Sequence, residues 1–198
     1  MKKVRGGLLA AAVAALVAIP AGAQFSESYS FLKAVRDRDG NKVTSIVSAP
    51  GSTVINTRDQ STGEGALHYV VRDRDTRWLS FLLSRGARAD IANNQGASPL
   101  TLAAQLGWVE GAELLLQRGA NVNHANSRGE TPLILAVQTR DVAMVRLLMQ
   151  NGANPNLTDN VAGFSALDYA RRDNRAQALL RVMESTNQPA RPAQGPRL

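Results

Sequence analysis

Apolar positions in the middle of the chain recur with the period of a short amphipathic helix. Leu100, Ala103 and Ala104 stand at i, i+3 and i+4, so they share one helical face. Ser98 precedes them as a candidate N-cap, and Pro99 occupies the first helical position, where its fixed φ and missing N–H are tolerated. The small alanines on this face allow a neighbouring element to approach closely. The pattern predicts a helix over residues 98–106.

A second helix is predicted directly after the first, from Val109 to Gln117. Gly107 separates the two helices. The second contains three consecutive leucines, Leu114 to Leu116, which implies neighbours on both of its sides. Gly119 follows this helix and suits the left-handed conformation of a helix C-terminus. Residues 121–128 are polar and show no helical period, so they predict an extended loop that ends in a tight turn.

The same block recurs along the chain at a nearly constant interval. The glycines that open it, Gly63, Gly96, Gly129 and Gly163, are spaced 33, 33 and 34 residues apart. A second set of glycines, each followed by alanine, repeats every 33 residues: Gly86, Gly119 and Gly152. One pair of short helices cannot bury its apolar face alone, so the blocks are expected to stack against each other.

The block begins with the pattern G-x-T-P-L-x-x-A and ends with L-L-L-x-x-G-A-x-x-N, and in pattern and period it resembles the ankyrin repeat. The resemblance implies an all-α solenoid of helix-turn-helix units with protruding hairpin-like loops, here called fingers. We count about five units. Residues 28–47 and 163–183 are expected to be the two end caps, because they carry charge where an inner unit is apolar.

Three segments depart from this pattern. Residues 65–68 read GALH instead of TPLH, so the first helix of that unit lacks a hydroxyl cap and is expected to start less firmly. Residues 49–62 form a long connection, and residues 159–162 contain one extra residue; both are expected to be loop variation at the surface. His68 occupies the histidine position of the pattern, where the resemblance implies hydrogen bonds to neighbouring backbone between units.

The N-terminus has the pattern of a secretory signal peptide. A positively charged start precedes twelve apolar residues, Leu8 to Ile19, and then the small-residue site AGA at 21–23. A membrane-spanning helix needs about 20 such residues. We therefore expect cleavage before Gln24 and a periplasmic or secreted product that does not insert into a membrane. The absence of cysteine excludes both a disulfide framework and a lipidated cysteine.

The sequence thus divides into three parts: a signal peptide, residues 1–23; a repeat domain, residues 24–186; and a tail, residues 187–198. The tail holds three prolines and a single large apolar side chain, so it is expected to be disordered. The formal net charge of +7 lies mostly outside the repeats: without the basic residues of the signal peptide and tail, 18 basic residues face 16 acidic ones. Arginines alternate with aspartates instead of forming a basic stripe, so no nucleic-acid partner is expected.

The sequence contains no constellation that indicates catalysis, a metal or a cofactor. Its two histidines, His68 and His124, have no second histidine or carboxylate at the spacing of metal ligands. The motifs H-E-x-x-H, G-x-x-x-x-G-K-[ST] and G-x-S-x-G are absent. Ser98 and Ser165 stand at helix starts, where a hydroxyl caps backbone N–H groups. We therefore expect a protein that is not an enzyme and that needs no cofactor.

Two classes of function remain open. The first is a non-catalytic exported module, expected to be monomeric, that binds a protein or peptide through its concave face. The alternative is a dedicated inhibitor or stabilising partner of one periplasmic enzyme, or a secreted effector that acts on a host protein. The two classes differ in the number and kind of proteins that would co-purify with the chain.

The resemblance implies that a partner contacts the finger tips and the outward turns of the first helices. Unit by unit, the predicted contact residues are Ser61, Thr62, Glu64, Arg72 and Asp73; Asn94, Gln95, Gln105 and Leu106; and Ser127, Arg128, Glu130, Gln138 and Thr139. Leu106 and Arg128 are expected to act as anchors at the centre of the row. Trp108 is a rival anchor, although packing between units also explains it.

Overall fold

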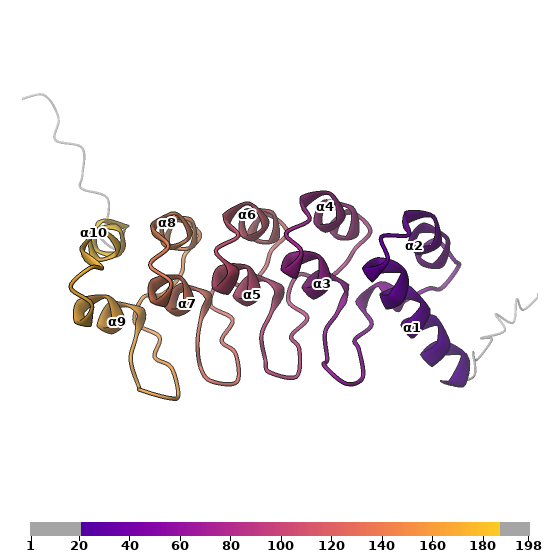
Figure 1. Ribbon diagram of the computed structural model, residues 1–198, viewed down its shortest axis with the longest axis horizontal. Helices are drawn as coiled ribbons and strands as arrows, with labels where there is room; N and C mark the ends of the chain where they lie inside the picture. The colour runs from indigo at the N-terminus through magenta and orange to yellow at the C-terminus, as the bar shows by residue number, and fades with distance from the viewer. Residues whose placement is uncertain (1–20, 187–198) are drawn as a thin grey trace, which may run out of the picture.

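The computed structural model describes residues 21–186 as a single row of stacked helix pairs with loops along one edge (Figure 1). In this part of the chain, extended pairing is limited to two isolated bridges, Arg58 with Gly65 and Thr158 with Ser165. The predicted all-α solenoid is therefore confirmed. The predicted tail and nearly all of the predicted signal peptide lie outside the described residues, and both stay predictions.

Five units follow one another, each with a first and a second helix. The first helices are α1 (Ala21–Arg36), α3 (Ala66–Arg72), α5 (Pro99–Leu106), α7 (Pro132–Gln138) and α9 (Ala166–Arg172). The second helices are α2 (Gly40–Val47), α4 (Thr76–Ser84), α6 (Val109–Gln117), α8 (Val142–Gln150) and α10 (Gln177–Thr186). A short 3-10 helix, η1 (Val54–Asn56), lies in the long connection after α2.

The inner helices begin and end at the residues that the sequence indicates. The Ser98 hydroxyl accepts the N–H of Thr101, and Pro99 is the first residue of α5. Gly107 ends α5 in the left-handed conformation, with φ of 66°. In α3, which lacks a hydroxyl cap, the His68 ring accepts the N–H of Gly65 at 3.1 Å. The N–H of His68, which a hydroxyl cap would accept, donates instead to the carbonyl of Gly65 at 3.0 Å.

One continuous apolar core runs along the row between first and second helices. Leu115 of α6 is fully buried, whereas Leu114 and Leu116 on either side of it are half-buried against neighbouring units. Ala103 and Ala104 are also fully buried, and α5 packs directly against α3 and α7. Small side chains on the first helices and leucines on the second helices therefore set the stacking distance, as the sequence predicts.

Candidate functional site

An asparagine side chain closes the turn of each inner finger. Oδ1 of Asn126 accepts the N–H groups of Arg128 at 2.9 Å and Glu130 at 3.0 Å. Asn93 makes the same pair of hydrogen bonds in the preceding finger. Because these bonds satisfy backbone donors locally, the finger tips keep a defined shape without a strand ladder.

The first and last fingers use Asp59 and Asp159 at this place, and each of these fingers contains one residue more than the inner ones. The Asp59 carboxylate accepts hydrogen bonds from the hydroxyl and N–H of Ser61 and from the N–H of Thr62, which lower its pKa to about 2. The extra residue predicted at 159–162 is thus confirmed. The extra residue of the first finger lies before Gly63, the first of the repeated glycines. No interval between these glycines includes it, so their spacing does not reveal it.

Backbone hydrogen bonds join consecutive finger tips. Each donor lies 32 residues after its acceptor. The three bonds run from the N–H of Asn94 to the carbonyl of Thr62 (2.9 Å), from Ser127 to Gln95 (2.9 Å) and from Asn160 to Arg128 (2.8 Å). Residues at equal offsets in successive units therefore stand side by side, and the first helices and fingers form one continuous face (Figure 1).

Most of the predicted contact residues are exposed on this finger and first-helix face. The exposed ones are Ser61, Thr62, Arg72, Asp73, Asn94, Gln95, Gln105, Ser127, Arg128, Gln138 and Thr139. Leu106 is half-buried. These residues are side by side and accessible, and whether a partner contacts them stays a prediction.

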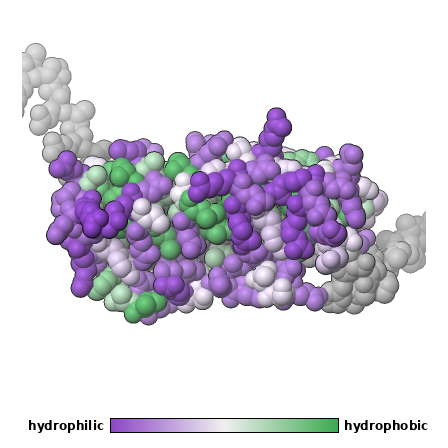
Figure 2. Space-filling model, viewed as in Figure 1, coloured by the Kyte–Doolittle hydropathy of each residue, from purple (hydrophilic) through white to green (hydrophobic). Residues whose placement is uncertain are grey.

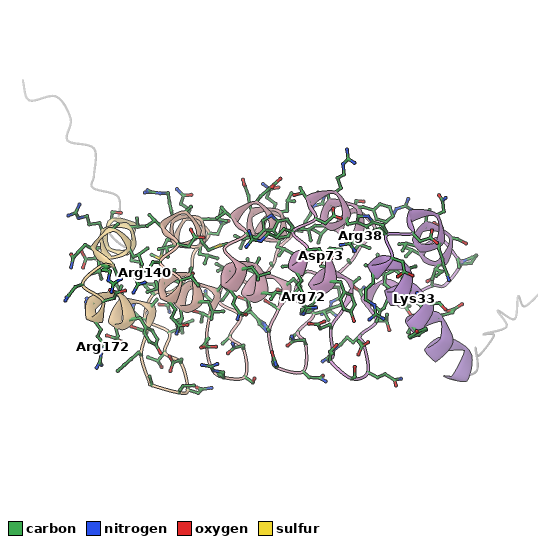
Figure 3. The ribbon with its side chains drawn as sticks, in the orientation of Figure 1. Lys33, Arg38, Arg72, Asp73, Arg140 and Arg172 are labelled. Atoms are coloured by element: carbon green, nitrogen blue, oxygen red, sulfur yellow. The ribbon has the colours of Figure 1, made fainter. Side chains whose placement is uncertain are left out.

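Glu64 and Glu130 do not lie on the surface, because their exposed fractions are only 7% and 6%. Glu64 accepts a hydrogen bond from Nη1 of Arg72 at 3.2 Å, and Glu130 pairs with Nη2 of Arg128 at 3.1 Å. Both carboxylates are thus less exposed than the other predicted contact residues, and whether a partner contacts them stays a prediction. Sequence position puts them in the row, but both carboxylates are buried and pair with exposed arginines, of which Figure 3 labels Arg72.

One apolar side chain in the middle of the face, Leu102, is absent from the predicted contact residues. Leu102 and Leu135 lie three residues before Gln105 and Gln138, so each leucine shares a helical face with its glutamine. Leu102 is half-buried like Leu106, so these two side chains form a short apolar strip on the face, whereas Leu135 is only 8% exposed and belongs to the core. Figure 2 shows hydrophobic residues among hydrophilic ones in the middle of the row and toward its C-terminal end. The 33-residue offset between the two leucines was the signal that could have found them.

Exposed arginines stand at both ends of this strip. Arg36 of α1 lies over the ring of Tyr69, 5.2 Å from its centroid, and Arg172 of α9 lies 4.2 Å from the centroid of Phe164. Because the last finger contains one residue more, Arg172 takes the place in α9 that Gln138 takes in α7. The face therefore has a leucine and amide centre between cationic ends.

His68 links two units. Its side chain is fully buried, and because Nδ1 accepts the N–H of Gly65, Nε2 carries the proton that it donates to the carbonyl of Ala97 at 3.0 Å. Burial lowers the pKa of His68, so the neutral ring is favoured. The bond between units that the resemblance implies is confirmed. His124 makes a similar contact to the carbonyl of Gly96, at 2.9 Å.

Trp108 is only 7% exposed, which supports packing as its role instead of anchoring a partner.

Among the described residues, no group of three histidine, cysteine or acidic side chains is arranged to hold a metal ion. In the same part of the chain, none of the helices combines the length and apolar character of a membrane span.

A solenoid of stacked helix pairs with a continuous exposed row defines a class of repeat protein that presents a surface. Two protein-family models agree with this fold: ankyrin repeats (3 copies) matches residues 31–126, and ankyrin repeats (many copies) matches residues 115–170. The chain is therefore an ankyrin-repeat protein. Ankyrin repeats are generally modules of protein–protein interaction, and the family is typically non-catalytic.

Proposed function

We propose that this protein is a non-catalytic, exported module that binds a protein partner through its finger and first-helix face. The proposal rests on one observation. Exposed side chains at equivalent positions of successive units form a row, and the hydrogen bonds between finger tips keep these units aligned. Side chains that are already ordered lose less conformational entropy when a partner binds. A rigid row of this kind suits a partner with a matching surface.

The chemistry of the face indicates what such a partner presents. Leu102 and Leu106 offer apolar area at the centre, and Gln105 and Gln138 offer donors and acceptors beside it. Arg128, fixed by Glu130, adds a positioned cation. The complementary surface has an apolar centre, polar groups that match the amides, and at least one carboxylate toward the fingers.

The decisive experiment identifies a partner by co-purification and compares affinities for variants of the face. Leu106→Ala and Arg128→Ala are expected to weaken binding by about tenfold or more if they are anchors. Glu110→Ala on α6 is the matched control, because Glu110 is exposed on the second-helix side. Normal affinity of the first two variants together with weak binding by the control would show that the face is wrongly assigned.

Export is part of the same proposal and rests on the N-terminal pattern alone. Mass spectrometry of the periplasmic fraction is expected to find a chain that begins at Gln24. An intact chain that begins at Met1 and sediments with the membranes would contradict export. If the partner is one enzyme in stoichiometric amount whose activity the chain lowers, the module is a dedicated inhibitor.

A further inference from the structure

The row of second helices is interrupted at one place. Helices α4 and α6, α6 and α8, and α8 and α10 pack directly against one another, whereas α2 packs mainly on α1 and η1 and lacks a comparable contact with α4. Figure 1 shows α2 set apart from α4 at this end of the row. The long connection after α2 contains η1, which contacts both α1 and α2.

The interruption leaves a groove of about 430 Å³, here called the α2–α4 groove. One wall is polar and small, with Gly40, Asn41 and Thr44 of α2. The other is formed by Arg77, Trp78 and Phe81 of α4. Its volume falls in the range of sites that take small ligands or a large side chain, about 300–1,000 Å³.

The floor of the groove is aromatic and lies open where the stack is closed elsewhere. The rings of Trp78 and Phe81 meet edge to face, with centroids 5.5 Å apart, and both side chains are half-buried. The positions equivalent to Trp78 in the next two units, Gly111 and Met144, are buried. Arg38 lies over Trp78 and Arg85 lies 5.3 Å from the centroid of Phe81, so each ring is partly covered, and the rest of the aromatic area lines the groove.

The cations at the groove are of two kinds. Arg38 lies over the Trp78 ring, 5.5 Å from its centroid, and is held by Asp73 at 2.7 Å and Asp75 at 3.0 Å, so its charge is balanced (Figure 3). Arg77 is exposed and makes no ion pair among the described residues. An unpaired guanidinium beside a half-exposed aromatic floor is complementary to a carboxylate next to a large apolar side chain.

We propose that the α2–α4 groove is a second docking site, which takes a short acidic segment of a partner protein. One leucine or phenylalanine of that segment packs on Trp78 and Phe81, and a neighbouring carboxylate pairs with Arg77. The groove lies between the second helices α2 and α4, and the Arg38–Asp73 pair marks its border with the finger and first-helix face, so one module can hold two segments at once. Two linked contacts of this kind raise the overall affinity without strengthening either one.

The test uses nuclear magnetic resonance, because the chain has only two tryptophans and hence two indole N–H signals, which Trp78→Phe assigns. The probe is a blocked synthetic peptide, Glu-Asp-Phe-Asp-Glu. Addition of this peptide is expected to shift the Trp78 signal to saturation and leave the Trp108 signal in place. Peptides with alanine in place of phenylalanine, or with lysines in place of the acids, are expected to bind about tenfold more weakly.

Two variants separate the two parts of the site. Arg77→Glu removes the cation and is expected to weaken binding of the acidic peptide about tenfold or more, whereas Arg146→Glu on α8, an equally exposed arginine, leaves it unchanged. Thr44→Phe fills the groove from α2 and is expected to abolish the shift. The proposal is overturned if no peptide shifts the Trp78 signal, if the lysine peptide binds equally well, or if Leu106→Ala weakens binding as much as Arg77→Glu.

Discussion

The indole ring of Trp108 occupies the space in which residue 111 would carry a side chain: a Cβ atom on Gly111 would lie 2.1 Å from Cε3 of the ring. Trp108 is the residue directly before α6, and Gly111 lies in the first turn of that helix. A glycine in a helix usually lowers stability by about 1 kcal/mol relative to alanine. Here the missing side chain allows the indole to fold back and cover the helix.

Gly111→Ala is therefore expected to destabilise the protein, against the usual helical preference for alanine. Overpacking of a close-packed site costs about 1–3 kcal/mol, and displacement of the ring would expose apolar area as well. Urea denaturation should show a lower midpoint, and Trp108 emission should shift to the red. Gly40→Ala is the control, because a Cβ there meets nothing within 4 Å; its midpoint should be unchanged or higher.

The turn between first and second helices carries an arginine in the left-handed conformation in three units, Arg38, Arg74 and Arg140, with φ between 53° and 59°. Each reaches toward the next unit, and Arg38 pairs there with Asp75, the N-cap of α4. The third unit has Gly107 at this turn. Asp141, which caps α8 in the following unit, consequently lacks the arginine that Asp75 has.

Gly107→Ala is expected to lower the free energy of unfolding by about 1–2 kcal/mol, the cost of placing a Cβ in the left-handed region. Gly107→Arg should lower it less, because the guanidinium can pair with Asp141, and this advantage should shrink as salt is added. Asp141→Asn keeps an N-cap acceptor but removes the charge. In the Asp141→Asn variant, Gly107→Ala and Gly107→Arg should lower the free energy of unfolding equally. A difference between them that persists in this variant would contradict the ion pair.

Local signals explain why so much of the inner fold could be predicted. Ser98, Pro99 and Gly107 fix the ends of α5 through backbone chemistry that needs no knowledge of neighbours. The predicted bounds of α6 also match, and Gly119, with φ of 80°, follows its C-terminus, but Trp108 at its N-cap makes no side-chain capping bond. The finger aspartates and asparagines carry an equally local signal, an Asx side chain before each tight turn, although the sequence analysis did not use it.

The parts of the site that sequence reasoning missed depend on the stack. Whether Glu130 is exposed follows from its finger packing against the next unit, which a repeat position alone does not reveal. The α2–α4 groove depends on how far the long connection moves α2 from its expected place. Burial and grooves between units are set by distances between elements, and the repeat pattern specifies only their order.

The last prediction concerns His68, which is buried as the neutral ring between two units. Burial lowers the pKa of His68, partly opposed by the Ala97 carbonyl and by Glu64. The ordinary pKa of a histidine is 6.5. Below that pH, His68 therefore binds a proton more readily in the unfolded chain than in the folded one. The resulting stability is fully present above that pH and is lost as the pH falls below it, with a slope of at most about 1.4 kcal/mol per pH unit for one proton.

Denaturation midpoints measured from pH 8 to pH 5 should thus fall in the parent and stay flatter in His68→Gln, which is less stable overall because the links to Gly65 and Ala97 are weakened. Asp59 does not interfere in this range. Its pKa is lowered from 3.8 to about 2, so its contribution is present above pH 3.8 and is lost only on further acidification. Parallel pH profiles for the parent and His68→Gln would show that protonation of His68 does not oppose folding.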